Sequence, residues 1–262
     1  MISLEELLIN NGVKFKNDKI SLPKWVKKIK IDIGLSFDAP HMQNWIDNDI
    51  NNEVFVFGIE PHPVWVKYLT SEIKDTNFKD YHRNTKELQY SNINNKCIIV
   101  PVAINNINNQ TTMKLYIPSA SDGCASLLKP NESILGSVIQ EYDVNVYKLS
   151  ELLDLIPFSD INQDEASNSI KYIEYIKIDV QGCDINVLQS AEKYLIDRVI
   201  YVTAEPENKQ YKNSENNSSE NIINYMNSIG FLHINHPNTS DPTFINKKFI
   251  DKANDIYIWQ KY

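Results

Sequence analysis

The chain has 262 residues, of which 42% are hydrophobic, and this is enough for one large α/β domain with a substantial core. Its net charge of −8 and isoelectric point near 5.2 argue against a general nucleic-acid or anionic-membrane surface and favour small neutral or cationic ligands. No apolar run approaches the ~20 residues that span a bilayer, and acids stand where a signal peptide needs a basic region, so we expect a soluble cytoplasmic protein without membrane insertion.

The first 29 residues are interpreted as a lead-in helix and extension, and residues 30–262 as one main domain. Ser3 and Glu6 have the spacing of a capping box, which predicts a short helix that ends near Gly12. The lysine-rich segment Lys24–Lys30 is interpreted as a solvated approach to the first strand rather than as a basic ligand patch.

The first buried strand ends in a sharp glycine turn. Ile31–Ile33 contains Asp32 and is followed directly by Gly34, after which small and polar residues lead to a helix that begins at Pro40. In open parallel sheets, ligands bind outside the carboxyl ends of the strands, because glycine lets the backbone approach a ligand and the next helix offers free N–H groups. His41 would lie near such a pocket, although an exposed polar role is the alternative.

A second apolar strand ends in the same way. Val54–Ile59 is followed by Glu60 and Pro61, and Glu60 comes 28 residues after Asp32, about one strand, helix and strand unit later. A carboxylate after the second strand can accept both hydroxyls of a ribose. The two endings together predict a nucleoside pocket.

The middle of the chain predicts a third strand and then a covering segment. Cys97–Ile104 is almost continuously apolar despite Pro101, and its end would face the adenine side of the pocket. Thr111–Leu128 first alternates and then becomes turn-rich, which predicts an antiparallel excursion or lid over the active site, with a protective edge hairpin as the alternative. The three cysteines form no CxxC pattern, so we expect reduced thiols and no zinc site.

The strand Tyr175–Val180 carries polar side chains toward its carboxyl end. Strand alternation puts Lys177, Asp179 and Gln181 on one side, which is costly in a buried strand unless something pairs them. A structural Lys–Asp ion pair explains part of the pattern, but the position at the end of a strand favours a functional role. Asp184 is then expected to cap the following helix.

The last part of the chain predicts three more strands. Val199–Ala204 closes on Glu205, and Asn217 is expected to cap a helix before the final strands at Phe231–Asn235 and Ile256–Trp259.

The sequence contains five short motifs in this order: DxG at Asp32–Gly34, EPxP at Glu60–Pro63, Val102–Ile104, Ser126–Leu127 and KIDxxG at Lys177–Gly182. In this order the motifs resemble those of the FkbM-type methyltransferase family. The resemblance covers residues 30–235 and implies a class I, Rossmann-like α/β fold: a mostly parallel seven-stranded sheet with helices on both faces, a reversed last strand and a small antiparallel excursion. It also implies transfer of a methyl group from S-adenosylmethionine to a hydroxyl, commonly on a sugar or a polyketide-type small molecule.

Two departures from the family pattern affect the site. The family's first loop is DxGANxG, whereas here Leu35 and Ser36 replace the Ala-Asn pair and Asp38 stands at the second glycine. The family's KIDVEG is KIDVQG here, so Gln181 cannot supply a charge. Its amide can still orient a substrate hydroxyl.

The candidate site residues fall into three groups, and no metal ligand set is predicted. For catalysis we expect Asp179 and Glu205 as base or orienting group, with His41 as a weaker third candidate. For S-adenosylmethionine we expect Asp32, Gly34, Leu35, Ser36, Glu60, Pro61, Ala103 and Ile104, and for the substrate Lys177, Gln181, Tyr116, Ser121 and Asp122.

The leading hypothesis is an O-methyltransferase that acts in the cytoplasm on a hydroxyl of a sugar or glycan precursor. A nicotinamide-dependent oxidoreductase would need a GxGxxG turn, and this loop has a single glycine. A non-catalytic glycan-binding or scaffold protein that retains the fold is the other alternative, motivated by the altered first loop and by Gln181. The acceptor and the oligomeric state are left open.

Overall fold

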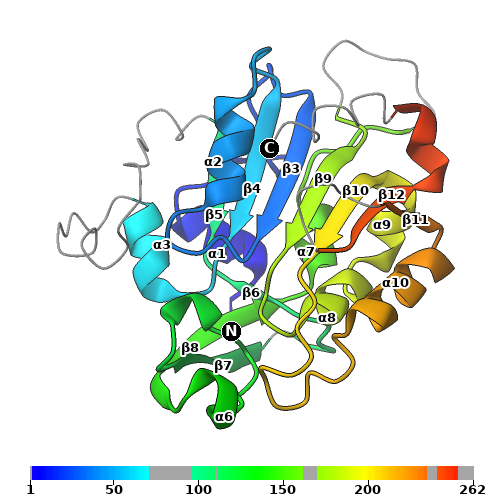
Figure 1. The fold of residues 1–262 in the computed structure, drawn as a ribbon. Coiled ribbons are helices and arrows are strands. Elements are labelled where there is room, and N and C mark those ends of the chain that lie inside the picture. Colours follow the sequence, from blue (N-terminus) through cyan, green and yellow to red (C-terminus); the bar gives the residue numbers. More distant parts are fainter. Residues whose placement is uncertain (1, 71–95, 110, 162–169, 235–240, 253–262) are drawn as a thin grey trace.

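The computed structural model describes residues 2–70, 96–109, 111–161, 170–234 and 241–252. Its centre is a seven-stranded sheet in the order β11-β12-β10-β9-β3-β4-β5 (Figure 1). The strands are β3 (Lys28–Ile33), β4 (Val54–Ile59), β5 (Cys97–Val100), β9 (Ile173–Ile178), β10 (Val199–Ala204), β11 (Phe231–Ile234) and β12 (Thr243–Asn246). All neighbours from β5 to β10 pair in parallel, and β12 runs antiparallel to both β10 and β11. This confirms the predicted mostly parallel sheet with a reversed last strand.

The strand order creates a switch point beside β3. The chain first adds β4 and β5 on one side of β3, and later adds β9 and β10 on its other side. The connections after β3 and after β9 therefore leave the sheet in opposite directions, which opens a crevice outside the carboxyl ends of these strands.

Helices cover both faces of the sheet, as predicted (Figure 1). One face packs against α1 (Leu4–Asn10), α7 (Leu149–Asp154), α8 (Asp184–Gln189), α9 (Glu192–Arg198) and α10 (Ser219–Ser228), which share one apolar core with the sheet. The other face packs against α2 (Pro40–Asp47), α3 (Pro63–Leu69) and the 3₁₀ helix η2 (Lys247–Lys252), which contribute to a second core.

The N-terminal segment packs against the first of these cores. The capping box of α1 is formed as predicted, since the Glu6 backbone N–H donates to Ser3 Oγ at 3.1 Å and the Ser3 backbone N–H donates to Glu6 Oε2 at 2.9 Å. A small hairpin follows, made of β1 (Phe15–Lys16) and β2 (Lys19–Ile20). Tyr147 Oη donates to the Ile2 carbonyl at 3.0 Å, which attaches the first residues of the chain to the excursion.

The predicted third strand is wrong in one respect, because it is two strands in two sheets. β5 ends at Val100, and β6 (Ala103–Ile104) joins a separate three-stranded sheet in the order β6-β8-β7. Pro101 lies between them, and its missing N–H and fixed φ favour a break in the ladder. The chain turns there, with the Val102 N–H donating to the Val100 carbonyl at 2.9 Å.

The predicted antiparallel excursion is present. It consists of β7 (Thr111–Pro118), the 3₁₀ turn η1 (Asp122–Cys124), α6 (Glu132–Leu135) and β8 (Val138–Tyr147). β7 and β8 pair antiparallel along their length, and Figure 1 shows the small sheet beneath the carboxyl ends of β3 and β4.

Two predicted helix caps are wrong. Asp184 is the first residue of α8 and does not cap it; its carboxylate instead accepts from Asn217 Nδ2 at 3.0 Å and from the Glu205 N–H at 3.3 Å. Asn217 does not cap α10, whose N-cap is Ser218; its Oδ1 accepts from the Ile185 N–H at 3.0 Å and so caps α8 from a distant part of the chain. Long-range partners replaced the local ones.

The C-terminal hairpin also differs from the prediction. β11 forms as expected, but its partner is β12, which the sequence analysis missed, and the predicted strand Ile256–Trp259 lies outside the described residues. Asn246, at the end of β12, holds this strand in place because its Nδ2 donates to the carbonyls of Leu195, Ile196 and Val199 at 3.0 to 3.1 Å.

Candidate active site

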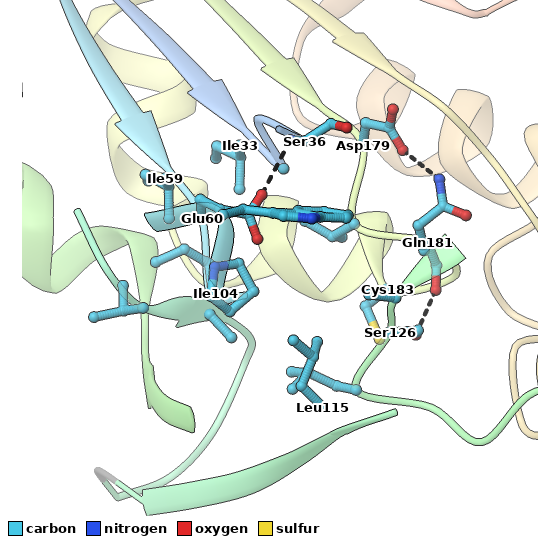
Figure 2. A pocket seen from close by; sticks show the side chains of 18 of the residues that line it. Ile33, Ser36, Ile59, Glu60, Ile104, Leu115, Ser126, Asp179, Gln181 and Cys183 are labelled. Atoms are coloured by element: carbon cyan, nitrogen blue, oxygen red, sulfur yellow. Dashed lines mark hydrogen bonds between the residues drawn. The ribbon is translucent and has the colours of Figure 1, made fainter. Parts of the chain in front are cut away.

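A cavity that is partly open to solvent lies at the switch point between the strand ends and the excursion (Figure 2). Its walls come from the segments that follow β3, β4, β5 and β9, and from the excursion opposite them. The lining residues are Ile33, Gly34, Ser36, Ile59, Glu60, Pro61, Trp65, Val102, Ala103, Ile104, Leu115, Gly123, Ala125, Ser126, Leu127, Asp179, Val180, Gln181 and Cys183.

Gly34 allows the ends of β3 and β9 to meet. A Cβ atom at Gly34 would lie 1.8 Å from the Asp179 carbonyl oxygen, and its φ of +89° is one that other residues rarely adopt. The Asp179 N–H in turn donates to the Ile33 carbonyl at 2.9 Å. The glycine predicted to approach a ligand is thus also required for the contact between two strand ends.

Glu60 faces the cavity from the end of β4. Its Oε1 accepts from the His62 N–H at 2.7 Å and its Oε2 accepts from the Ser36 N–H at 3.0 Å, the latter marked in Figure 2. Burial raises the pKa of Glu60 to about 8, and these two hydrogen bonds act in the opposite direction. Each carboxyl oxygen has a second lone pair, so Glu60 still has acceptor capacity toward a ligand.

His62 and Trp65 fix the start of α3 beside Glu60. His62 Nδ1 accepts from the Trp65 N–H at 3.5 Å, and the two rings stack with centroids 4.3 Å apart. Burial lowers the pKa of His62 to about 4, so the ring is neutral at pH 7. His62 is structural, and Trp65 is a lining residue that the sequence analysis missed.

Two of the predicted cofactor residues lie outside the cavity. Asp32 is buried and its Oδ2 accepts from the Met42 N–H at 3.0 Å, which caps the start of α2; burial raises the pKa of Asp32 to about 7. The Leu35 side chain is buried in the second core beside Gly58 and Met42. The other six predicted cofactor residues, Gly34, Ser36, Glu60, Pro61, Ala103 and Ile104, line the cavity.

Lys177 forms an ion pair with Glu205 rather than with Asp179. Its Nζ lies 3.0 Å from Glu205 Oε2 and 3.7 Å from Asp241 Oδ2, and the side chain is only 3% exposed. Burial alone would raise the pKa of Glu205, but the ammonium group outweighs it and the pKa of Glu205 is lowered. Lys177 and Glu205 therefore both remain charged, and neither lines the cavity.

Asp179 does line the cavity, directly after β9. Burial raises the pKa of Asp179 to about 6, and the neighbouring Glu205 also raises it, while Lys177 and a hydrogen bond from Gln181 lower it. A carboxylate that titrates near neutrality is suited to accept a proton. His41 is exposed, but the protein around its ring and the nearby Lys177 lower the pKa of His41 to about 4.

The excursion contributes to the cavity through other residues than those predicted. Tyr116, Ser121 and Asp122 are not lining residues: the Tyr116 ring lies beneath Lys129 Nζ at 5.6 Å, and Ser121 caps η1. The excursion instead presents Leu115, Gly123, Ala125, Ser126 and Leu127. Only Gln181 of the predicted substrate residues lines the cavity, and the roles of all five stay predictions.

The family model for the methyltransferase FkbM domain matches residues 32–232, which is most of the chain. The chain belongs to the FkbM methyltransferase family. No curated protein matches the chain. The crystal structure of methyltransferase FkbM from Methylobacillus flagellatus KT is similar to it with a TM-score of 0.43 and 13% sequence identity, over 93% of this chain and 48% of that one. The chain thus spans about half the length of that relative.

Within the ranges that the structure describes, no group of three or more His, Cys, Asp or Glu side chains has the arrangement of a metal site. In the same ranges, no helix is long and apolar enough to cross a membrane.

The contact between Gly34 and Asp179 leads to a first prediction. Gly34→Ala should lower the free energy of unfolding by about 2 kcal/mol or more beyond Gly12→Ala, measured by chemical denaturation. Gly12 is a matched control, because its φ is +82° but a Cβ there would meet nothing within 4 Å. Equal losses in the two variants would show that only backbone strain, and not the close contact, makes glycine necessary at position 34.

Proposed function

We propose that the protein is an S-adenosylmethionine-dependent O-methyltransferase whose acceptor is a hydroxyl of a sugar or glycan precursor, methylated in the cytoplasm. The observation that carries this proposal is one cavity at the switch point with two carboxyl groups in different places on its wall. Glu60 follows β4, and Asp179 follows β9 (Figure 2). Family membership supplies the class of reaction.

The cavity residues fit the cofactor. The wall of the cavity is mostly apolar with a few polar side chains, which is typical of small-molecule sites. Glu60 would bind the ribose hydroxyls through its remaining lone pairs; hydroxyls both donate and accept, so either protonation state of Glu60 can bind them. Ile59, Ala103, Ile104 and Leu115 supply an apolar surface for the adenine.

Asp179 would act on the acceptor. When bound, S-adenosylmethionine would supply a methyl group on a positively charged sulfur. The acceptor oxygen would attack the methyl carbon while the carbon–sulfur bond breaks, and the electrons of that bond would stay on sulfur. Asp179 would take the proton that the hydroxyl loses, and Gln181 beside it can orient the same hydroxyl. Glu205 stays ionised in its pair with Lys177 and so favours a proton arriving on Asp179 rather than on itself.

The charge around Asp179 supports a neutral acceptor. Glu205 and Asp241 both lie close enough to Lys177 to raise its pKa, and Glu205 also raises the pKa of Asp179, so carboxylates outnumber the ammonium of Lys177 among these groups. An acceptor carboxylate would meet like charge here, whereas a sugar hydroxyl would not. This supports O-methylation of a hydroxyl over methyl ester formation.

A second prediction concerns Glu60. Glu60→Ala should weaken the binding of S-adenosylmethionine about tenfold, because it removes hydrogen bonds to two ribose hydroxyls that contribute ~0.5–1.5 kcal/mol each. Isothermal titration calorimetry measures this, with Glu220→Ala, an exposed substitution at the start of α10, as the control. The Ser36 and His62 N–H groups lose their acceptor in Glu60→Ala, so a thermal melt must show that the variant is folded at the assay temperature. Wild-type affinity in a folded variant would remove Glu60 from the cofactor site.

A third prediction concerns Asp179. Asp179→Asn should lower the turnover number about 10²–10⁴-fold while the cofactor still binds, because the amide cannot accept the hydroxyl proton. Glu205→Gln should have a smaller effect, since it removes a charge that does not line the cavity. Asp143→Asn, on the exposed side of β8, is the control. If both Asp179→Asn and Glu205→Gln kept near-normal turnover, positioning alone would have to account for catalysis.

The acceptor class is tested with labelled cofactor and a panel of nucleotide sugars, free glycans, catechols and carboxylic acids. We expect label on a sugar hydroxyl. Label that appears only on catechols or acids would overturn the sugar assignment, and tight cofactor binding without turnover on any acceptor would favour the binding-protein alternative.

A further inference from the structure

Gln181 lies in a left-handed turn after β9, and its side chain is hydrogen-bonded on both sides. Its φ is +56° and that of Gly182 is +95°, so two successive residues after β9 adopt left-handed backbone. The turn places the Gln181 side chain between two partners. Its Nε2 donates to Asp179 Oδ1 at 2.7 Å, and its Oε1 accepts from Tyr211 Oη at 2.7 Å (Figure 2 marks the first of these contacts).

Tyr211 is held in place from several sides. The residue is 3% exposed, and its ring packs so closely on Gly182 that a Cβ there would lie 2.9 Å from Cδ2. Its segment pairs with the excursion, since the Lys212 N–H donates to the Lys129 carbonyl at 2.8 Å and the Asn131 N–H donates to the Gln210 carbonyl at 2.7 Å. The Tyr211 hydroxyl also lies 2.9 Å from the Cys124 carbonyl and can share its proton between the two acceptors.

These partners fix which way the Gln181 amide faces. If the amide were reversed, its oxygen would face the Asp179 carboxylate and two acceptors would meet at 2.7 Å. The observed orientation gives Asp179 a donor and gives the tyrosine hydroxyl an acceptor. A glutamate at position 181, as in the family pattern, could not donate to Asp179 unless it were protonated.

We propose that Tyr211 and Gln181 are positioning residues for Asp179, with the tyrosine hydroxyl locking the Gln181 amide so that it donates to Oδ1 and aims the carboxylate into the cavity. A donated hydrogen bond favours the charged form of a carboxyl group, so the same contact keeps Asp179 available as a proton acceptor. The kinetic part of this inference depends on the proposed methyl transfer, but the titration of Asp179 does not.

Several charged groups surround Asp179, so a variant that tests its pKa must leave those groups unaltered. Burial raises the pKa of Asp179 to about 6, and the hydrogen bond from Gln181 lowers it. The charged or titratable groups that influence Asp179, or are influenced by it, from the elements packed around it are Lys177, Glu205, Glu207, Asp184, Asp32, Glu60, Cys124 and Tyr211. None of these carboxyl or ammonium groups is altered by Tyr211→Phe, which removes only a hydroxyl.

The first test follows the Asp179 carboxyl by carbon NMR in the full-length chain without cofactor, with the signal assigned through Asp179→Asn. Tyr211→Phe should raise the pKa of Asp179 by about one unit, and Gln181→Glu should raise it further because two carboxyl groups would then share one proton. Tyr225→Phe is the matched control, since its hydroxyl also bonds a carboxylate, Glu192 at 2.9 Å, but on the distant helix α10. It should leave the titration unchanged.

The second test is kinetic. Tyr211→Phe should lower the turnover number about threefold near pH 6.5 and about tenfold near pH 5, leave the KM for the cofactor unchanged, and recover toward wild type above pH 8, because the acid limb of the pH profile moves with Asp179. A merely structural role would lower activity equally at all pH values. Circular dichroism checks that each variant is folded.

An unchanged Asp179 titration in both folded variants, Tyr211→Phe and Gln181→Glu, would overturn the inference whether or not the protein methylates anything. The same holds if Tyr211→Phe were to lose activity to the same degree across the pH range. Conversely, a wild type that binds no cofactor would overturn the proposed function, while a shifted titration would still support the role of Tyr211 and Gln181.

Discussion

The close contact between the ends of β3 and β9 is the constraint on which the rest of the site depends. These strands are neighbours because the chain adds β4 and β5 on one side of β3 and then returns to add β9 on the other side. Their ends come together only because position 34 has no side chain. Any Cβ there would meet the Asp179 carbonyl, so a larger residue would push the β9 turn away from β3. The distance between the loop that follows β3 and the Asp179 backbone is therefore set by backbone packing.

Buried carboxyl groups organise the loops around this contact. Asp32, Glu60 and Asp184 are each almost fully buried, which raises the pKa of each. Each accepts a backbone N–H, Asp32 from the start of α2, Glu60 from the N-cap of α3 and Asp184 from the residue that follows β10. Burial of a carboxyl group is costly unless donors compensate it. These donors also fix the loop backbone, so the cost of burial is offset by contacts that shape the cavity wall.

Much of the fold followed from local patterns. Apolar runs that end in Gly34, Glu60 and Asp179 located three strand ends, because buried parallel strands and the turns after them have a clear signature. The position of Trp65 on the cavity wall and the bonds of Tyr211 had no such signal, and Ser126 stood out only as part of the motif Ser126–Leu127. Ser126 bonds a carbonyl 55 positions away and Tyr211 an amide 30 positions away, contacts that no local spacing encodes. Strand alternation alone could have shown that Asp32 faces α2, since its neighbour Ile33 lines the cavity.

Gln181, which stands where the family pattern has glutamate, links the β9 turn to the covering segment through its hydrogen bonds. Its side chain contacts Asp179 and Tyr211, and its backbone carbonyl accepts from Ser126 Oγ at 2.7 Å. The Ser126 hydroxyl also accepts from the Leu128 N–H at 3.0 Å, so the covering segment is tied to the same turn. A displacement of the excursion would therefore move Gln181, and with it the donor to Asp179. The covering segment, Gln181 and Asp179 are thus one connected unit, and the neutral amide of Gln181 joins them without placing a further negative charge beside Asp179.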